Sequence, residues 1–305
     1  MFTSSVYIGL DVGGSKTELL ACTSNGTAER LRLWGPGANV QRLGVETTAG
    51  ILADLIHQAL GRYPDGQLST VCAGIAGAGQ AADQEALSKR LLDVLDVPHP
   101  PPRIRIVHDA QIALEAAFEE GSGVVVIVGT GSVVFARTRN GALDRTGGWG
   151  YLLGDEGSGF ALGQSGLRAV ARAIDGGPET LLRSWVAEHH GLDGRDRLIH
   201  EVYQHNWPVQ DIAPLVIRAA AAGDAVARGI VDEQTRLLAR QVEWLTARCD
   251  NLEPRVALLG GLVQEAYYAQ VLRRTLRERL ADWSIQTMRR RPVVGALRLA
   301  CRMPA

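Results

Sequence analysis

The sequence predicts an α/β protein made of two similar halves with a cleft between them. Each half begins with apolar strands joined by a turn rich in glycine and hydroxyl side chains, "GGSKT" at 13–17 and "GTGS" at 129–132. Each half then continues into helices, which is the pattern of a duplicated supersecondary unit. With 305 residues, the chain is long enough to bury two separate cores.

The overall composition is that of an ordinary enzyme, with 46% hydrophobic and 21% charged residues and a net charge of -1. So balanced a charge gives no electrostatic attraction to nucleic acid or to a membrane surface. The apolar run at 124–128 is too short to cross a bilayer, and the N-terminus shows no leader pattern. We therefore expect a cytoplasmic protein with no nucleic-acid partner and no membrane contact.

Short apolar runs and helical periodicity alternate along the chain. In the first half we expect strands at 6–12, 18–23 and about 28–34, a helix at 45–60, a strand in "STVCAGI", a helix at 83–95, a strand ending at 109 and a helix at 110–118. In the second half we expect strands on both sides of the second turn, a further strand turning at 140–141, helices over about 160–248, a strand in "RVALLGGL", and helices at about 267–280 and 294–302.

The first turn has almost the spacing of a phosphate loop. Gly9 and Gly14 fit G-x-x-x-x-G-K-[ST], but Ser15 stands where that motif has lysine. A strand is expected next, whereas a phosphate loop needs a helix directly after its glycines. The better interpretation is a hairpin whose amides form an anion nest, with Ser15, Lys16 and Thr17 adding donors, although hairpins also favour glycine for steric reasons.

Asp11 precedes this turn and would repel a bound phosphate unless a cation such as Mg²⁺ lay between them. The turn at 129–132 repeats the same chemistry after another apolar strand. Two such turns facing each other across a cleft would hold a polyphosphate from both sides, although each taken alone is equally an ordinary hairpin.

Asp109 stands where a strand ends and a helix begins, the usual place for functional residues in open α/β sheets. An aspartate there also serves as a helix N-cap, and the two roles are compatible. We interpret the preceding His108 as a solvent or loop residue.

The segment "GGWGYLLGDEGSGFALG" at 147–163 is too rich in glycine for a short structural turn and is interpreted as a binding loop. Trp149 either stacks on a sugar ring or fills core, while Asp155 and Glu156 also suit the N-terminal dipole of the helix that follows. The pair Gly260-Gly261 is either a strand exit or a place where a flat base lies over backbone.

Taken in order, these motifs resemble those of the sugar kinase, actin and Hsp70 ATPase superfamily. The matching stretches are "IGLDVGGSKTE", "IVHDAQIA", "VIVGTGSV", "VALLGGLV" and "VVGALRLA", which span nearly the whole chain. The glycine-rich loop is similar to the branch that joins N-acetylglucosamine and glucosamine kinases with the BadF/BadG/BcrA/BcrD ATPases. The resemblance implies two ribonuclease H-like domains of the actin-like ATPase fold around an interdomain cleft: residues 1–118 with about 292–305, and residues 119–291 with the helical region 160–248.

The resemblance also implies roles for single residues, with ATP and Mg²⁺ as cofactors. Asp109 matches the catalytic base that accepts the proton of the sugar hydroxyl, and Asp11 matches the carboxylate that organises Mg²⁺ through water. The positions matching nucleotide contacts are Asp11, Gly13, Gly14, Ser15, Lys16, Thr17, Gly129, Thr130, Gly131, Ser132, Gly260 and Gly261. The positions matching sugar contacts are Asn39, Ala76, Gly77, Asp109, Gly148, Trp149 and Asp155. Ala76 and Gly77 stand where the animal enzyme has a serine and a glycine, so polar recognition there is altered or comes from backbone.

The resemblance thus implies an ATP-dependent amino-sugar kinase that phosphorylates the 6-hydroxyl of N-acetylglucosamine, with glucosamine and glucose as other candidates. A homodimer is common in the resembled family. The alternative is an ATPase activator of a 2-hydroxyacyl-CoA dehydratase or benzoyl-CoA reductase, a class that holds an iron-sulfur cluster between two subunits with two cysteines from each. A third candidate, a sugar-sensing regulator, would need a DNA-binding segment, for which there is no room before the first strand.

The cysteines favour the kinase over the ATPase activator. Cys22, Cys72, Cys249 and Cys301 are scattered along the chain, have no metal-ligand spacing with one another or with histidines, and do not adjoin the second turn. We interpret them mostly as small buried residues, the first two inside strands and the last two in helices.

Overall fold

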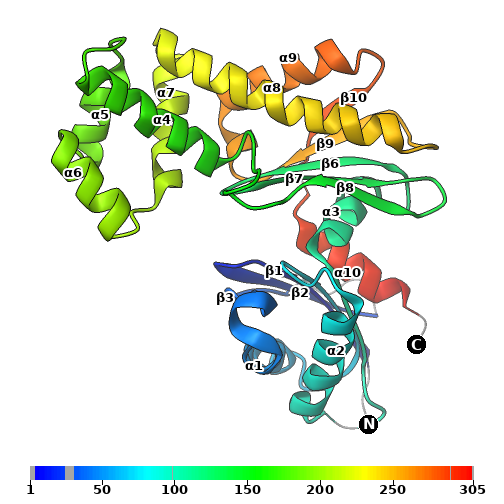
Figure 1. Ribbon diagram of the computed structural model, residues 1–305. Helices are drawn as coiled ribbons and strands as arrows, with labels where there is room; N and C mark the ends of the chain where they lie inside the picture. Colours follow the sequence, from blue (N-terminus) through cyan, green and yellow to red (C-terminus); the bar gives the residue numbers. More distant parts are fainter. Residues whose placement is uncertain (1–3, 25–30, 98, 289, 304–305) are drawn as a thin grey trace. The chain divides into compact units, whose positions relative to one another are not determined.

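The computed structural model of the chain describes residues 4–24, 31–97, 99–288 and 290–303. The chain forms two compact units, residues 1–121 with 289–305 and residues 122–288, here called the N-terminal unit and the second unit. Each contains one five-stranded mixed sheet with helices packed on it (Figure 1). The α/β class expected from the sequence is confirmed.

The N-terminal unit contains the strands β1 (Ser4–Val12), β2 (Lys16–Thr23), β3 (Leu31–Pro36), β4 (Gly66–Ile75) and β5 (Arg103–His108). Its helices are α1 (Val40–Leu60), α2 (Ala81–Leu95), α3 (Asp109–Phe118) and α10 (Pro292–Arg302). The strand order is β3-β2-β1-β4-β5. The first three strands form an antiparallel meander, and β4 and β5 run parallel to β1.

Two boundaries in this unit differ from those expected. β3 reaches Pro36, while its expected start near residue 28 and the turn residues 25 and 26 lie outside the described residues. α1 begins at Val40 instead of residue 45, because the Asn39 side chain caps it by accepting hydrogen bonds from two backbone N–H groups of its first turn. Gly44, with a φ of 75°, then interrupts the regular helix.

Side chains of β1 alternate between the two faces of the sheet. Those at even positions from 6 to 12 are buried in a core shared with α1 and α2. Tyr7 packs on the opposite face against α10, and a Cβ added to Gly9 on that face would lie 2.2 Å from the Leu297 nitrogen. The two helix pairs, α1 with α2 and α3 with α10, thus cover opposite faces (Figure 1). Asp11 is two residues beyond Gly9 in β1, so its side chain lies on the same face of the sheet as Tyr7, the face covered by α3 and α10.

The second unit contains the strands β6 (Gly123–Val128), β7 (Ser132–Arg137), β8 (Leu143–Gly147), β9 (Arg255–Leu259) and β10 (Ser284–Thr287), in the order β10-β9-β6-β7-β8. Its α-helices are α4 (Gly159–Ile174), α5 (Leu181–His190), α6 (Arg195–Ile199), α7 (Ala213–Ala221), α8 (Ala225–Arg248) and α9 (Ala266–Arg279). The helical region expected over 160–248 is present. The edge strand β10 was not expected from the sequence, because only four residues form it and none is fully buried.

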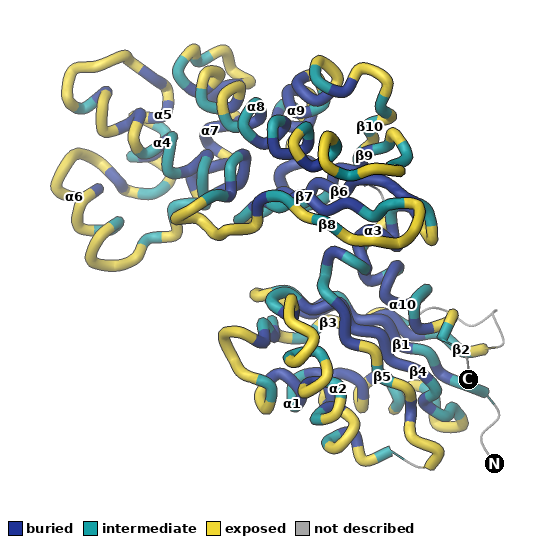
Figure 2. Tube along the Cα trace, turned by 45° about the vertical axis from the view of Figure 1, so that its right-hand side comes forward, coloured by how far each residue is buried: buried dark blue, intermediate teal, exposed yellow. Residues whose placement is uncertain are grey.

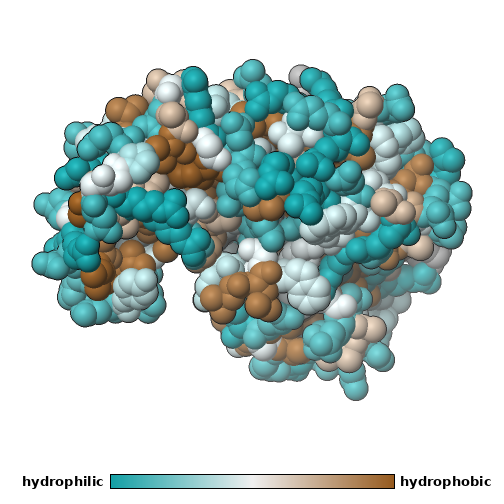
Figure 3. Space-filling view, turned by 45° about the horizontal axis from the view of Figure 1, so that its top comes forward, coloured by the Kyte–Doolittle hydropathy of each residue, from teal (hydrophilic) through white to brown (hydrophobic). Residues whose placement is uncertain are grey.

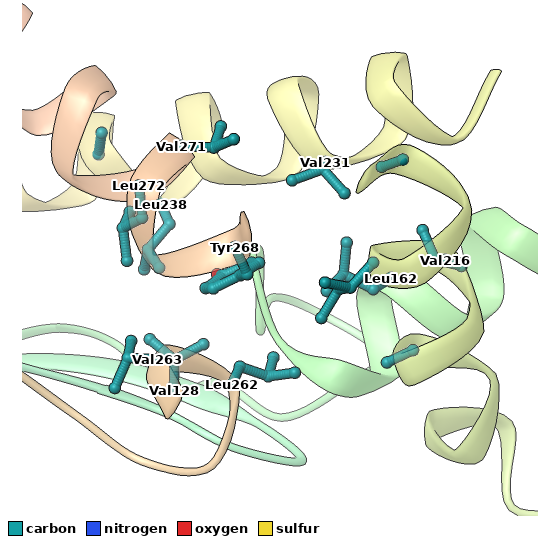
Figure 4. Close-up of a cluster of buried hydrophobic side chains, with 14 of the residues drawn as sticks. Val128, Leu162, Val216, Val231, Leu238, Leu262, Val263, Tyr268, Val271 and Leu272 are labelled. Carbon is teal, nitrogen blue, oxygen red and sulfur yellow. The ribbon is translucent and has the colours of Figure 1, made fainter. Parts of the chain in front are cut away.

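The core of the second unit surrounds Tyr268, a large side chain that is fully buried. In Figure 4 it lies among apolar side chains from β6, α4 and α8, including Val128, Leu162 and Leu238. The strands β6, β7 and β9 are mostly buried, whereas α6 is largely exposed (Figure 2). The Tyr268 ring of α9 thus packs against core residues of α4, α8 and the sheet.

The described helices include none that is long and apolar enough to cross a membrane. On the face drawn in Figure 3, hydrophobic side chains lie in several separate groups among hydrophilic ones.

The close packing of α10 on β1 gives a first prediction. Gly9→Ala should lower the free energy of unfolding by about 3 kcal/mol or more, because the added methyl group would collide with the backbone of α10. Urea denaturation measures this. Gly229→Ala in α8 is the matched control, because a Cβ there meets open space and alanine favours helix over glycine. Equal stability of the Gly9→Ala variant and the wild type would contradict the packing described.

Candidate active site

The first glycine-rich turn is a tight hairpin between β1 and β2. Gly13 donates its N–H to the Lys16 carbonyl at 2.9 Å, and residues 14–16 are exposed at the tip. The Thr17 hydroxyl, expected to face a phosphate, is instead buried and donates to the Pro36 carbonyl at 2.7 Å. The exposed N–H groups of the tip and the Lys16 ammonium are therefore the groups that this hairpin offers to an anion.

Asp11 lies near other carboxylates. It is the cross-strand partner of Glu18, so both side chains lie on the face of α3 and α10. Burial raises the pKa of Asp11 from an ordinary value of 3.8 to about 7, and the charges of Asp109 and Glu18 add to this, while Lys16 opposes it. A divalent cation at this place would offset both the burial and the repulsion, so the residues present fit the expected Mg²⁺.

Glu18 forms ion pairs with two arginines. Its buried carboxylate lies 3.1 Å from Arg32 Nε and 3.2 Å from Arg291 Nη1. The Trp34 ring lies beside this group, with Lys16 Nζ 5.1 Å and Arg291 Cζ 5.4 Å from its centroid. Sequence reasoning missed Trp34 and Arg291. In the sequence, this cluster is indicated only by the spacing of Lys16 and Glu18, which are two residues apart and so lie on one face of β2.

Asp109 is the first residue of α3, at the carboxyl end of β5. Its Oδ1 accepts a hydrogen bond from the Ala110 N–H at 2.8 Å and lies 2.6 Å from His108 Nδ1. His108, expected to be a solvent or loop residue, is instead the last residue of β5 and occupies the N-cap position of α3. Its Nδ1 lies 3.1 Å from the Ala110 nitrogen as well, so His108 and Asp109 Oδ1 both contact the first turn of α3, and Asp109 Oδ2 takes no part in these contacts.

Asn39 and Gly77 are brought together in the N-terminal unit. Gly77 has a φ of 87°, and a Cβ added to it would lie 3.1 Å from Asn39 Oδ1. Ala76 donates its N–H to the Val12 carbonyl at 2.9 Å, which fixes this segment beside the end of β1. The absence of a side chain at Gly77 therefore leaves room for the Asn39 amide.

The second glycine-rich turn and the loop at 147–158 form one hydrogen-bonded structure. Asp155 is buried, has a φ of 64°, and accepts a hydrogen bond from the Ser132 N–H at 3.3 Å. The Ser132 hydroxyl donates to the Glu156 carbonyl at 2.7 Å, and the Gly159 N–H donates to the Gly129 carbonyl at 2.8 Å. A side chain at Gly131 would collide with the Asp155 carboxylate.

Side chains of helices α8 and α9 form hydrogen bonds with this loop. Tyr268 donates its hydroxyl to the Gly157 carbonyl at 2.7 Å, and Gln234 Oε1 accepts from the Gly157 N–H at 3.0 Å. Gln241 Nε2 donates to Glu156 Oε2 at 2.6 Å. None of these three supporting side chains was expected from the sequence, because each lies more than seventy residues away in the chain.

Two residues of this loop differ in burial: Asp155 is buried and Trp149 is exposed. Burial raises the pKa of Asp155, while the Ser132 amide and Glu156 act in opposite directions. Trp149, by contrast, is 69% exposed, so the core-filling interpretation of this side chain is wrong. Gly148 donates its N–H to the Ser132 carbonyl, which fixes the backbone just before Trp149.

Gly260 has a steric role at the end of β9. Its φ is 112°, and a Cβ there would lie 2.1 Å from the Val128 carbonyl oxygen of β6. The strand-exit interpretation therefore accounts for Gly260. A Cβ on Gly261 meets no atom within 4 Å, so open space lies beside this residue.

Comparison with known proteins identifies the family. The model of the BadF/BadG/BcrA/BcrD ATPase family matches residues 8–300. The chain belongs to this family. The branch that the sequence motifs resemble is therefore confirmed.

Three relatives of this family member are informative. An N-acetylmuramic acid/N-acetylglucosamine kinase of Clostridium acetobutylicum is 30% identical over 269 residues, covering 86% of each chain. An N-acetyl-D-glucosamine kinase of Dictyostelium discoideum is 26% identical over 317 residues, covering 98% of each. A crystal structure from Chromobacterium violaceum, provisionally assigned as an N-acetylglucosamine kinase, superposes with a TM-score of 0.76 at 24% identity and covers 97% of this chain and 98% of its own. This likeness confirms the predicted fold class, that of the sugar kinases.

The raised pKa of Asp11 predicts a pH dependence of stability in the absence of divalent cations. Between about pH 4 and pH 7 the folded state keeps a proton on Asp11 that the unfolded chain has lost, so the free energy of unfolding should fall as pH rises. Asp11→Asn should remove this contribution, at most about 1.4 kcal/mol per pH unit. Urea denaturation in EDTA at pH 5 and pH 8 measures it. An unchanged difference between variant and wild type at the two pH values would contradict the assignment.

Proposed function

We propose that this protein is an ATP-dependent amino-sugar kinase that phosphorylates the 6-hydroxyl of N-acetylglucosamine. The observation that carries the proposal is the placement of two aspartates on one face of the N-terminal sheet. Asp11 is the next-to-last residue of β1, beside an exposed glycine hairpin, and Asp109 begins α3 near enough to raise the pKa of Asp11. The names of the two curated relatives support this choice of sugar.

Asp109 is proposed as the general base that accepts the proton of the attacking hydroxyl. Its contacts with His108 and the Ala110 amide involve Oδ1, which leaves Oδ2 for the substrate. A carboxylate positioned in this way typically contributes about 10²- to 10⁴-fold to the rate. Phosphoryl transfer otherwise requires mainly positioning and charge stabilisation.

The phosphates are proposed to bind the exposed hairpin tip at 14–16 and the second turn at 129–132. Asp11 is proposed to hold Mg²⁺ through water, and the bound ion supplies positive charge that stabilises the transferring phosphoryl group. Lys16 adds a further positive charge, and the neighbouring Trp34 ring restricts its side chain. The open space beside Gly261 suits the adenine ring.

The sugar is proposed to contact Asn39, the backbone at Ala76 and Gly77, and the loop carrying Gly148, Trp149 and Asp155. Asn39 Oδ1 already caps α1, so its amide nitrogen is the group proposed for the sugar. Trp149 is exposed enough to stack on a sugar ring. Because Asp155 also accepts a hydrogen bond from the Ser132 amide, it would link sugar recognition to the second turn. A cytoplasmic homodimer is the proposed state, since the reaction consumes ATP and dimers are common in the resembled family.

The cysteines do not support the alternative ATPase activator. Only Cys72 is buried, so the expectation of mostly buried cysteines is wrong. Cys22 and Cys301, distant in sequence, have sulfur atoms 3.7 Å apart. Cys22 lies six residues along β2 from Lys16, about 20 Å at the usual rise of a strand, so the pair that it forms with Cys301 of α10 does not adjoin the proposed phosphate site.

Asp109→Asn tests the proposed mechanism. The variant should bind ATP and sugar but lose at least about 10²-fold in kcat, because the amide cannot accept the proton. Steady-state kinetics and sugar binding by calorimetry measure the two effects. Asp83→Asn, which changes a carboxylate in the first turn of α2, is the matched control and should leave kcat unchanged. Wild-type turnover in the Asp109→Asn variant would refute the role of this carboxylate.

A further inference from the structure

A cluster of potential metal ligands lies in the second unit, apart from the residues of the proposed kinase site. α6 (Arg195–Ile199) continues directly into a π-helical turn, His200–Gln204. In an α-helix, residues five apart point about 140° away from each other, whereas a π-helical turn stacks them. The turn therefore places His205 next to His200, a juxtaposition that ordinary helical spacing does not give.

Three side chains converge at this turn. One ligand atom from each of His200, Glu201 and His205 lies within 4.8 Å of the others. Glu201 Oε2 lies 3.1 Å from His205 Nδ1, and the two imidazole rings meet edge to face with centroids 4.5 Å apart. Both histidines are exposed, while Glu201 is partly buried.

A surface ion pair does not account for the whole cluster. Arg197 Nη2 lies 3.3 Å from Glu201 Oε1, a common i, i+4 pairing. The other carboxylate oxygen faces His205, on the side away from this contact. The second imidazole, His200, completes a set of two nitrogens and one oxygen around the same point.

The backbone that carries the cluster is anchored to its surroundings. Trp207 donates its N–H to the Glu201 carbonyl at 3.1 Å, and its ring contacts His190 of α5 edge to face at 5.1 Å. Leu198, just before the turn, is buried in the core of the second unit. The ligands thus project from a fixed turn, which reduces the entropy lost when they gather round an ion.

We propose that His200, Glu201 and His205 bind one Zn²⁺ ion, with water as the fourth ligand. Two imidazoles and one carboxylate are an established ligand set for four-coordinate zinc, and imidazole disfavours Mg²⁺ and Ca²⁺. Bond lengths of about 2.0–2.2 Å separate tetrahedral ligands by about 3.4 Å. Because no two of the three ligand atoms lie more than 4.8 Å apart, each separation has to shorten by at most about 1.4 Å, which rotation of two exposed side chains provides. The bound ion would stabilise the π-helical turn, because its ligands come from both ends of the turn.

Isothermal titration calorimetry with ZnCl₂ tests this site on the full chain, with any affinity tag removed and after treatment with EDTA. The wild type should bind one equivalent, and binding should persist in millimolar Mg²⁺. His200→Ala and His205→Ala should each weaken the affinity at least about tenfold, and Zn²⁺ should raise Tm for the wild type but not for the double variant.

His189→Ala is the matched control, because His189 is an exposed histidine of the neighbouring α5 whose Nδ1 contacts the Trp185 carbonyl instead of the cluster. It should bind Zn²⁺ like the wild type. Absence of binding to the wild type would overturn the proposal. Unchanged binding in the double variant would overturn it as well, because the ion would then lie elsewhere. Circular dichroism of each variant confirms that it is folded.

Discussion

The close approach of α3 and α10 to the N-terminal sheet determines where the proposed catalytic groups lie. Two glycines of the sheet permit this approach, because a Cβ at Gly9 or Gly74 would lie less than 2.5 Å from an atom of α10 or α3. Gly295 of α10 likewise permits the two helices to approach each other, since a Cβ there would lie 2.0 Å from the Ile112 carbonyl oxygen of α3. With these helices in place, the face that carries Asp11 also carries the N-terminus of α3 and hence Asp109. The burial of Asp11 and its repulsion by the Asp109 charge then follow from the packing, and both favour a bound cation beside Asp11.

The second unit depends on a different kind of contact. Its glycine-rich loop is joined to the turn at 129–132 by backbone hydrogen bonds and by the Asp155 carboxylate, and Tyr268 holds it from the core. Glycine is needed here for positive φ angles and for close approach, not for mobility. A substrate that contacts this loop would therefore meet a pre-formed surface, which lowers the entropic cost of binding.

The two carboxylates of the candidate site could be predicted from the sequence because they lie at the ends of strands. Asp11 and Asp109 each follow an apolar run, and strand ends at one edge of a parallel sheet lie together. The residues that were missed act through contacts distant in the chain: Arg291 reaches Glu18 and Trp34, and Tyr268 reaches Gly157. Two predictions made from residue type alone were wrong. The Thr17 hydroxyl donates to the Pro36 carbonyl instead of facing a phosphate, and His108, not Asp109, occupies the N-cap position of α3.

In the proposed reaction, the γ-phosphoryl group of ATP is transferred to an amino sugar and ADP is released. The most direct measurement is ADP release with N-acetylglucosamine, N-acetylmuramic acid, glucosamine and glucose, each compared with ATP alone, together with detection of the sugar phosphate. N-acetylglucosamine should accelerate ADP release strongly and yield one sugar 6-phosphate per ADP. ADP release that is equally fast without any sugar, and that yields no sugar phosphate, would contradict the proposed reaction.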